Sequence, residues 1–127
     1  MKIGGMGMTE NSDKQIALCS CGAAAVHVSG APRSVYGCSC VECQRATGSI
    51  FAYRAIYPLA AVQAVHGELK SWRRTGDSGR WLDQFFCPEC GVILYMTAEA
   101  LPGAISVSVG CFGDPNFAGP TTIHHLH

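Results

Sequence analysis

Short stretches in which apolar side chains occupy alternate positions dominate the chain and predict strands. Residues 24–28 and 105–109 show this period of two most clearly, as expected for a strand with one buried face. Two longer segments, 69–74 and 80–86, flank a glycine-containing loop at 75–79 and predict a hairpin. Aromatic and β-branched residues predict further strands over 33–37, 50–57, 62–66 and 92–96.

Helical signals are few. Residues 41–47 contain no proline or glycine and can form one or two turns, which Gly48 would end. A second short helix is expected at 97–101. We therefore expect a mainly β fold with one or two short helices, built from strands so short that packing alone gives little stability.

The composition fits one folded domain and excludes several classes of protein. The chain has 127 residues, of which 48% are apolar and 14% charged, and its basic and acidic side chains balance to no net charge. A disordered chain would carry more charge, and a nucleic-acid-binding surface would be basic. No apolar run approaches the roughly 18 residues of a membrane helix. We expect neither a nucleic-acid partner nor membrane insertion.

One domain is expected over residues 16–118, between an N-terminal tail at 1–15 and a C-terminal tail at 119–127. The segment before Met8 is too short for a signal peptide, so we interpret it as a start-site artefact or a cloning remnant. Without a signal peptide, the expected location is the reducing cytoplasm. In such a compartment a high cysteine content indicates metal binding rather than disulfides.

The eight cysteines form three groups and one isolated residue. The first group is Cys19-Ser20-Cys21-Gly22, the second Cys38-Ser39-Cys40-Val41-Glu42-Cys43, and the third Cys87-Pro88-Glu89-Cys90-Gly91. In the third group the glycine lets the backbone turn, so that both sulfur atoms can reach one ion about 2.3 Å away. Cys111 stands alone and is expected to be a small core residue.

The grouped cysteines divide naturally into a closed site and an open site. A structural zinc takes four protein ligands, whereas a catalytic zinc often takes three and leaves the fourth position to water or substrate. The first and third groups would supply the closed site. The second group is contiguous enough to surround an ion without long-range help and would form the open site. Spacing also permits another division, in which Cys40 and Cys43 join the third group.

A non-catalytic interpretation explains the same residues. A fourth ligand such as His27, His66 or Glu42 could close the second group, and both ions would then only stabilise a small β domain. Structural zinc contributes on the order of 10 kcal/mol to folding, which gives this interpretation a physical basis. A redox role for Cys87 and Cys90 is disfavoured, because no βαβ pattern surrounds them.

The order and spacing of these motifs resemble those of the glutathione-dependent formaldehyde-activating enzymes, which share a domain with centromere protein V. The resemblance extends from about Ile16 to Asn116. Besides the three cysteine groups, it rests on these segments: Gln44-Arg45-Ala46-Thr47-Gly48-Ser49, Gly67-Glu68-Leu69, Phe86 before Cys87, and residues 110–115.

The resemblance implies a β-tent fold, in which small antiparallel sheets surround two zinc ions per chain. The implied ligands are Cys19, Cys21, Cys87 and Cys90 for a structural ion, and Cys38, Cys40 and Cys43 for a catalytic ion. The implied activity is of the zinc-dependent carbon–sulfur lyase type, in which glutathione and formaldehyde join into S-(hydroxymethyl)glutathione.

Three features depart from the pattern of that family. Ser39 stands where the family usually has a histidine between the first two cysteines of the second group. Gln84 stands where it often has an arginine, and three residues follow His124 where the family usually continues to a tryptophan. The cysteine ligands are all present.

Other side chains are candidates for substrate binding. Glutathione carries two carboxylates, so arginine partners are expected, and Arg45 is favoured because it directly follows the second group. The other arginines considered are Arg54, Arg73, Arg74 and Arg80. Ser39 and Thr47 are candidates for a hydrogen bond to a bound group or to a sulfur atom.

The sequence fits two functions from different classes. The favoured one is an enzyme that performs thiol–aldehyde chemistry at an open zinc site, with a small thiol such as glutathione as its partner. The alternative is a non-catalytic, zinc-stapled protein-binding module.

Overall fold

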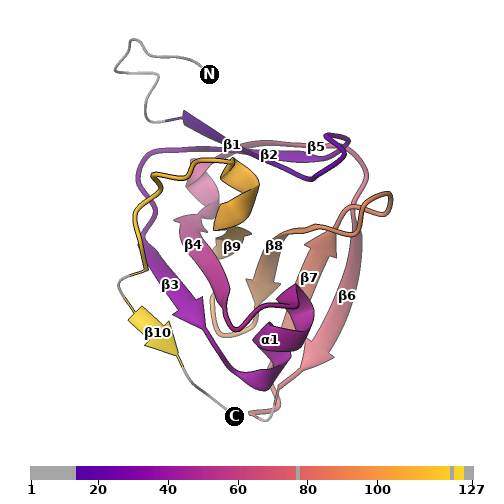
Figure 1. Cartoon of the computed structure of the whole chain (residues 1–127), viewed down its shortest axis with the longest axis vertical. Coiled ribbons are helices and arrows are strands. Elements are labelled where there is room, and N and C mark those ends of the chain that lie inside the picture. Colours follow the sequence, from indigo (N-terminus) through magenta and orange to yellow (C-terminus); the bar gives the residue numbers. More distant parts are fainter. Residues whose placement is uncertain (1–13, 77, 121, 125–127) are drawn as a thin grey trace.

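The described residues form ten strands and one short α-helix, which confirms a mainly β protein (Figure 1). The computed structural model describes residues 14–76, 78–120 and 122–124. The elements in chain order are β1 (Lys14–Leu18), β2 (Ala25–Ser29), β3 (Ser34–Cys38), α1 (Val41–Thr47), β4 (Ala52–Pro58), the 3-10 helix η2 (Leu59–Ala61), β5 (Val62–His66), β6 (Lys70–Thr75), β7 (Trp81–Phe86), β8 (Ile93–Ala98), β9 (Ala104–Ser108), the 3-10 helix η3 (Val109–Phe112) and β10 (Thr122–His124).

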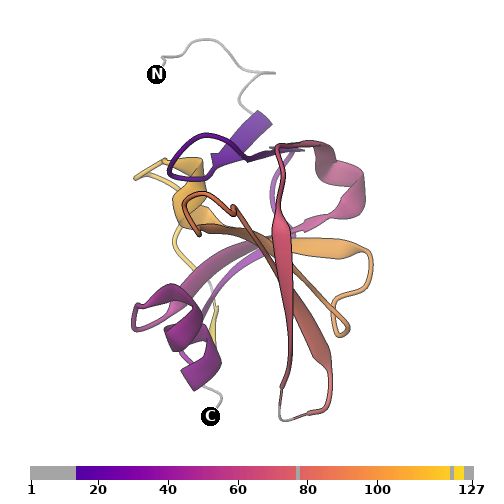
Figure 2. The same ribbon diagram turned by 90° about the vertical axis from the view of Figure 1, so that its right-hand side faces the viewer.

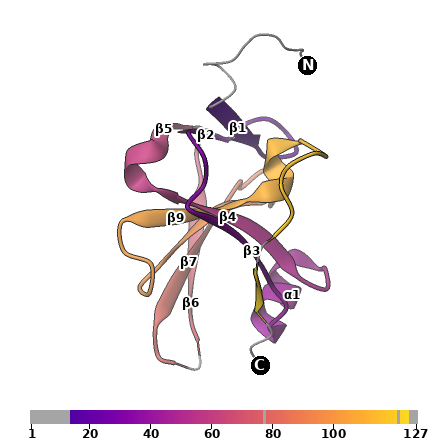
Figure 3. The ribbon, with the colours of Figure 1, turned by 90° about the vertical axis from the view of Figure 1, so that its left-hand side faces the viewer.

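The strands form two sheets of unequal size. The smaller sheet has the order β1-β2-β5, and the larger has the order β10-β3-β4-β9-β8-β7-β6. Among these strands every pairing is antiparallel except that of β10 with β3. The small sheet lies across one end of the molecule, and α1 and the β6–β7 hairpin extend toward the opposite end on different sides (Figures 2 and 3).

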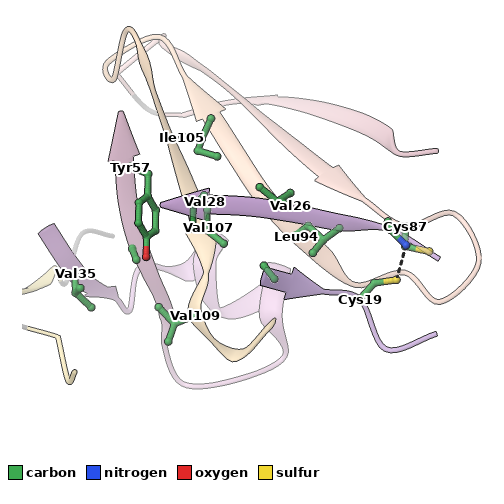
Figure 4. Packing of buried hydrophobic residues seen from close by; sticks show 13 residues of the cluster. Cys19, Val26, Val28, Val35, Tyr57, Cys87, Leu94, Ile105, Val107 and Val109 are labelled. Atoms are coloured by element: carbon green, nitrogen blue, oxygen red, sulfur yellow. Dashed lines mark hydrogen bonds between the residues drawn. The ribbon is translucent and has the colours of Figure 1, made fainter. Parts of the chain in front are cut away.

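The hydrophobic core lies between the two sheets (Figure 4). Val26 and Val28 on β2 pack against Tyr57 and Val107 of the large sheet, and all four side chains are buried. The period of two in these strands produces this arrangement, because every second side chain points to the same face. Full burial of each such side chain contributes about 1.5–3 kcal/mol.

The other face of the large sheet carries polar and charged side chains as well as apolar ones. Val35, Ala55 and Val107 are register partners on the core side. Their neighbours Tyr36 and Arg54, which are also register partners, therefore lie on the opposite face. Arg54, on this face, is one of the candidate substrate-binding arginines.

Most of the elements expected from the sequence are present. The helix at 41–47 is confirmed, and Gly48 ends it in a left-handed conformation with φ of 70°. The strands and the hairpin lie within a few residues of their predicted bounds. The short strands β1 and β10 were not expected, and their lengths give little period to detect.

The helix expected at 97–101 is wrong. Strand β8 continues to Ala98, where Thr97 and Ala98 pair with β7, and a turn closed by the Leu101 N–H and the Ala98 carbonyl oxygen follows. Pro102 and Gly103 come too soon for a helix to form. Cross-strand pairing therefore outweighs a weak local preference.

Gly67, between β5 and β6, lies very close to the backbone of Ala23 and Ala24 in the loop before β2. Its φ is +86°, and a Cβ atom placed there would overlap the Ala23 carbonyl oxygen and the Ala24 Cα atom. Gly67→Ala is expected to lower the free energy of unfolding by about 2–5 kcal/mol, because left-handed strain and overpacking both contribute. Urea unfolding of the metal-loaded protein measures this change.

Gly103→Ala is the matched control, since Gly103 also has positive φ, at +72°, but open space around its Cβ position. It is expected to cost about 1–2 kcal/mol from strain alone. Equal losses in the two variants would contradict the close packing of the loop at Gly67.

Candidate metal centres

The sulfur atoms of Cys19, Cys21, Cys87 and Cys90 all lie within 4.8 Å of one another. We call these four residues the first centre. They come from the loop between β1 and β2 and from the loop between β7 and β8. The Sγ atom of Cys21 lies 3.6 Å from that of Cys19 and 3.7 Å from that of Cys87. Four sulfur ligands at such distances fit the tetrahedral donor set of a structural metal ion.

Each loop of the first centre turns at a glycine. Gly22 and Gly91 have φ of 78° and 80°, a conformation that favours glycine. Each donates its N–H to the carbonyl oxygen of Cys19 or Cys87, at 3.1 and 2.8 Å. The Ala24 N–H points at the Cys19 Sγ atom, 3.3 Å away, and Figure 4 shows Cys19 and Cys87 together at one end of the core.

The thiols of the first centre influence one another electrostatically. Backbone N–H groups, those of Val92 and Cys21 foremost, lower the pKa of Cys90 to about 6. The Ala23 N–H lowers the pKa of Cys21, but the crowding thiols of Cys19 and Cys87 outweigh it and raise that pKa to about 12. Cys90 therefore ionises more readily than Cys21. A cation among the four sulfur atoms would stabilise the others as thiolates as well.

Cys38, Cys40 and Cys43 form a second set of sulfur atoms within 4.8 Å of one another. We call it the second centre. Cys38 is the last residue of β3, Cys40 is the N-cap of α1, and Cys43 lies in its first turn. The Cys38 and Cys40 Sγ atoms are 3.5 Å apart, and the Cys43 N–H donates to the Cys40 Sγ atom at 3.4 Å. A strand end followed by a helix start thus places three sulfur atoms together.

The structure decides between the divisions that the spacing left open. Cys87 and Cys90 lie with Cys19 and Cys21, so Cys40 and Cys43 do not join the third group. Two clusters that could hold metal ions are present, as the sequence predicted.

Within residues 14–76 and 78–120, the second centre has three cysteine ligands and no histidine or carboxylate as a fourth. His27 and His66 lie on the small sheet, with ring centroids 4.9 Å apart. Glu42 is exposed in the first turn of α1. The proposed closure of this centre by one of these three residues is therefore wrong. A metal ion here would keep one position for another ligand.

Arg54 on β4 lies beneath the second centre. Its side chain is only 2% exposed, and its Nη1 atom donates to the Cys43 Sγ atom at 3.5 Å. Burial by itself would raise the pKa of Cys43, but the hydrogen bond and the positive charge of Arg54 outweigh burial and lower that pKa. Burial is the main cause that raises the pKa of Cys38 to about 12. Arg54 thus favours the thiolate form of Cys43, whereas burial favours the thiol form of Cys38.

Arg54 was one of five arginines considered from the sequence, and Arg45 was favoured over it. The structure places Arg45 exposed in the last turn of α1. The sequence signal for Arg54 is a charged residue within the apolar run of β4. Alternation alone does not show which element covers that face of the sheet.

The polar residues predicted beside the second centre support its backbone. The Thr47 hydroxyl donates to the Cys43 carbonyl oxygen at 2.9 Å, and the Gln44 side-chain amide donates to the Ser39 carbonyl oxygen at 2.8 Å. Ser39 is buried. These bonds hold the loop and the helix start that carry the three cysteines.

A cavity of about 320 Å³ lies on the same face of the large sheet. Tyr36 and Ile56 line it; they are the next positions on that face after Cys38 and Arg54, roughly 7 Å along each strand. The Tyr36 hydroxyl is 3.0 Å from the Ser106 hydroxyl, across β4. The second centre and this mainly apolar cavity thus lie on the same face of the sheet, although none of the three cysteines lines the cavity.

Cys111 belongs to neither centre. It is half-buried against the core, with its Sγ atom 3.8 Å from the Ile93 carbonyl oxygen. Burial chiefly raises the pKa of its thiol to about 11, so it remains protonated at neutral pH.

No helix in the described part of the chain has the length and apolar character needed to cross a membrane.

Comparison with known proteins gives a family and similar solved structures. The family model for the glutathione-dependent formaldehyde-activating enzyme matches residues 14–126. The crystal structure of a Rhodobacter sphaeroides protein, a Northeast Structural Genomics target, is similar with a TM-score of 0.65 and 21% identity. The match covers 85% of this chain and 98% of that one, and at this identity it shows the fold alone. No curated protein matches the chain.

Cys87→Ser and Cys40→Ser are expected to separate the two centres. Cys87→Ser should remove one metal ion and cost several kcal/mol of stability, because the first centre joins two loops at the end of the core. Cys40→Ser should also remove one ion but change the melting temperature little, since a serine still caps α1. Elemental analysis and thermal unfolding measure these effects, and equal destabilisation by both variants would contradict the assignment.

Proposed function

The chain belongs to the glutathione-dependent formaldehyde-activating enzyme family, and on that premise we propose that its second centre joins a small thiol, foremost glutathione, to formaldehyde. The observation that carries the proposal is a cluster of three cysteines to which no histidine or carboxylate of residues 14–76 and 78–120 adds a fourth ligand. The proposed enzyme is a carbon–sulfur lyase acting in the direction of addition.

The proposed reaction needs no oxidant or second cofactor. The thiol sulfur attacks the aldehyde carbon and forms a carbon–sulfur bond, while the carbonyl π electrons move to the oxygen. That oxygen takes up the proton that the thiol loses, and the product carries an S-hydroxymethyl group. At neutral pH most of a free thiol is protonated, so holding it in its reactive form is the main task of the site.

We propose zinc as the ion of both centres. Ligand sets made only of cysteine thiolates favour zinc over hard cations such as magnesium or calcium. Zinc in the second centre would supply the positive charge that deprotonates a thiol and polarises an aldehyde oxygen. All eight cysteines are free, which supports a reducing compartment such as the cytoplasm for this protein.

The residues around the second centre would position the substrate. Cys38, Cys40 and Cys43 hold the ion, and the exposed guanidinium of Arg45, two residues after Cys43 on α1, is proposed to bind a carboxylate of glutathione. Ser39 and Thr47, on either side of the cysteines, are proposed to hydrogen-bond the polar parts of the substrate.

Cys40→Ser is expected to reduce the acceleration of S-(hydroxymethyl)glutathione formation to the rate without protein. The reason is that the variant loses one of the three ligands that hold the ion. Exchange between carbon-13-labelled formaldehyde and its glutathione adduct, followed by NMR, measures the rate above the uncatalysed reaction.

Cys111→Ala is the matched control, because it removes a half-buried thiol outside both centres. It should keep the wild-type rate. A fully active Cys40→Ser variant would overturn the role of the second centre. A wild-type protein that holds both ions but neither binds glutathione nor accelerates the reaction would instead favour the non-catalytic, zinc-stapled binding module.

A further inference from the structure

Arg54 is a buried cation that has no carboxylate partner among the described residues. Its Nη1 atom contacts the Cys43 sulfur, and its Nε atom is buried without a hydrogen-bond partner there. The ion pair found in the described part of the chain joins Arg73 to Asp83, on exposed strands. The register neighbours of Arg54 on β3 and β9 are Tyr36 and Ser108, and neither is a carboxylate.

A buried arginine needs a negative charge close to it. The guanidinium cannot lose its proton in a protein, and burial of an unpaired charge is strongly unfavourable. The sulfur atoms of the second centre are the acceptors that the structure provides, through the contact at 3.5 Å between Arg54 and Cys43. Arg54 and the three cysteines therefore form one electrostatic unit.

We propose that Arg54 is the counter-ion of the second centre, a positioning residue that neutralises one sulfur charge so that a bound divalent ion can accept an anionic fourth ligand. Three thiolates, one divalent ion and one guanidinium sum to no net charge. Without the guanidinium the same centre is already negative and repels a further anion. Addition of a thiolate to it would then place two unbalanced negative charges in a buried site.

The part of this inference that concerns the fourth ligand rests on the proposed function, because it takes that ligand to be the thiolate of the substrate. The part that concerns the ion does not. A residue that stabilises a metal ligand through a hydrogen bond changes metal affinity by about 10- to 100-fold. Metal affinity can be measured without glutathione or formaldehyde, so the two parts can fail separately.

Three variants separate charge from hydrogen bonding and from packing. Arg54→Lys keeps the charge, Arg54→Gln keeps a donor without the charge, and Arg54→Met keeps only an extended apolar side chain. The first centre, which does not contact Arg54, serves as an internal control because it should retain its ion in every variant. Arg80→Gln, at the exposed end of the hairpin, is the matched surface control.

The first measurement is the affinity of each centre for cobalt(II), from the absorption of the cobalt–thiolate bonds in competition with a chelator. Arg54→Met and Arg54→Gln should bind the second ion about 10- to 100-fold more weakly, whereas Arg54→Lys should remain within several-fold of the wild type. If Arg54→Gln matches the wild type, the hydrogen bond suffices and the counter-ion role is wrong. Unchanged affinity in both neutral variants also overturns the proposal.

The second measurement is the binding of 2-mercaptoethanol to the cobalt-loaded protein. This thiol has no carboxylate, so a direct contact of arginine with glutathione cannot produce the effect. Arg54→Met should bind it about tenfold more weakly than the wild type. Equal affinity in the two proteins would overturn the role in accepting an anion, even if the effect on metal affinity holds.

Loss of folding in the Arg54 variants would also decide for or against the proposal. If the two neutral variants unfold while Arg54→Lys folds and holds both ions, the charge at this position is required and the proposal stands. If Arg54→Lys also loses its fold, a charge alone does not replace Arg54 and the proposal fails. Failure of glutathione turnover in a wild-type protein that holds both ions would contradict the proposed function but leave the charge balance of the second centre intact.

Discussion

Two loops far apart in the chain bring four sulfur atoms together, and this contact joins the small sheet to the large sheet. Cys21 and Cys87 are 66 positions apart in the sequence, yet their sulfur atoms lie 3.7 Å from each other. One of the loops that hold them connects β1 and β2 of the small sheet, and the other connects the neighbouring strands β7 and β8 of the large sheet. With strands of only three to seven residues, a cation shared by these loops would add stability that the small core lacks.

The second centre is built in a different way. Its three cysteines lie within six consecutive residues, and a strand end, an N-cap and a first helical turn orient them. Such a local arrangement does not need two sheets to meet. The sheet instead supplies the surroundings: β4 pairs with β3 and carries Arg54 into contact with Cys43.

The two faces of the large sheet therefore have different structural roles. One face packs against the small sheet and forms the core, with Tyr57 and Val107 among its buried side chains. The other carries Arg54, which contacts Cys43 of the second centre, and the residues Tyr36 and Ile56 that line the cavity. Because successive residues of a strand point to opposite faces, a few strands can supply both the core and the site.

Much of this protein is determined by local sequence. The period of two predicts most strands, residues 41–47 with Gly48 predict the helix, and cysteine spacing predicts the ligand groups, because each signal depends on neighbours in the chain. Only the tertiary structure decided that the third group joins the first rather than the second. It also decided that Arg54 contacts the sulfur atom of Cys43. The first depends on how the two sheets pack together and the second on the pairing of β3 with β4, and the order of residues contains neither distance.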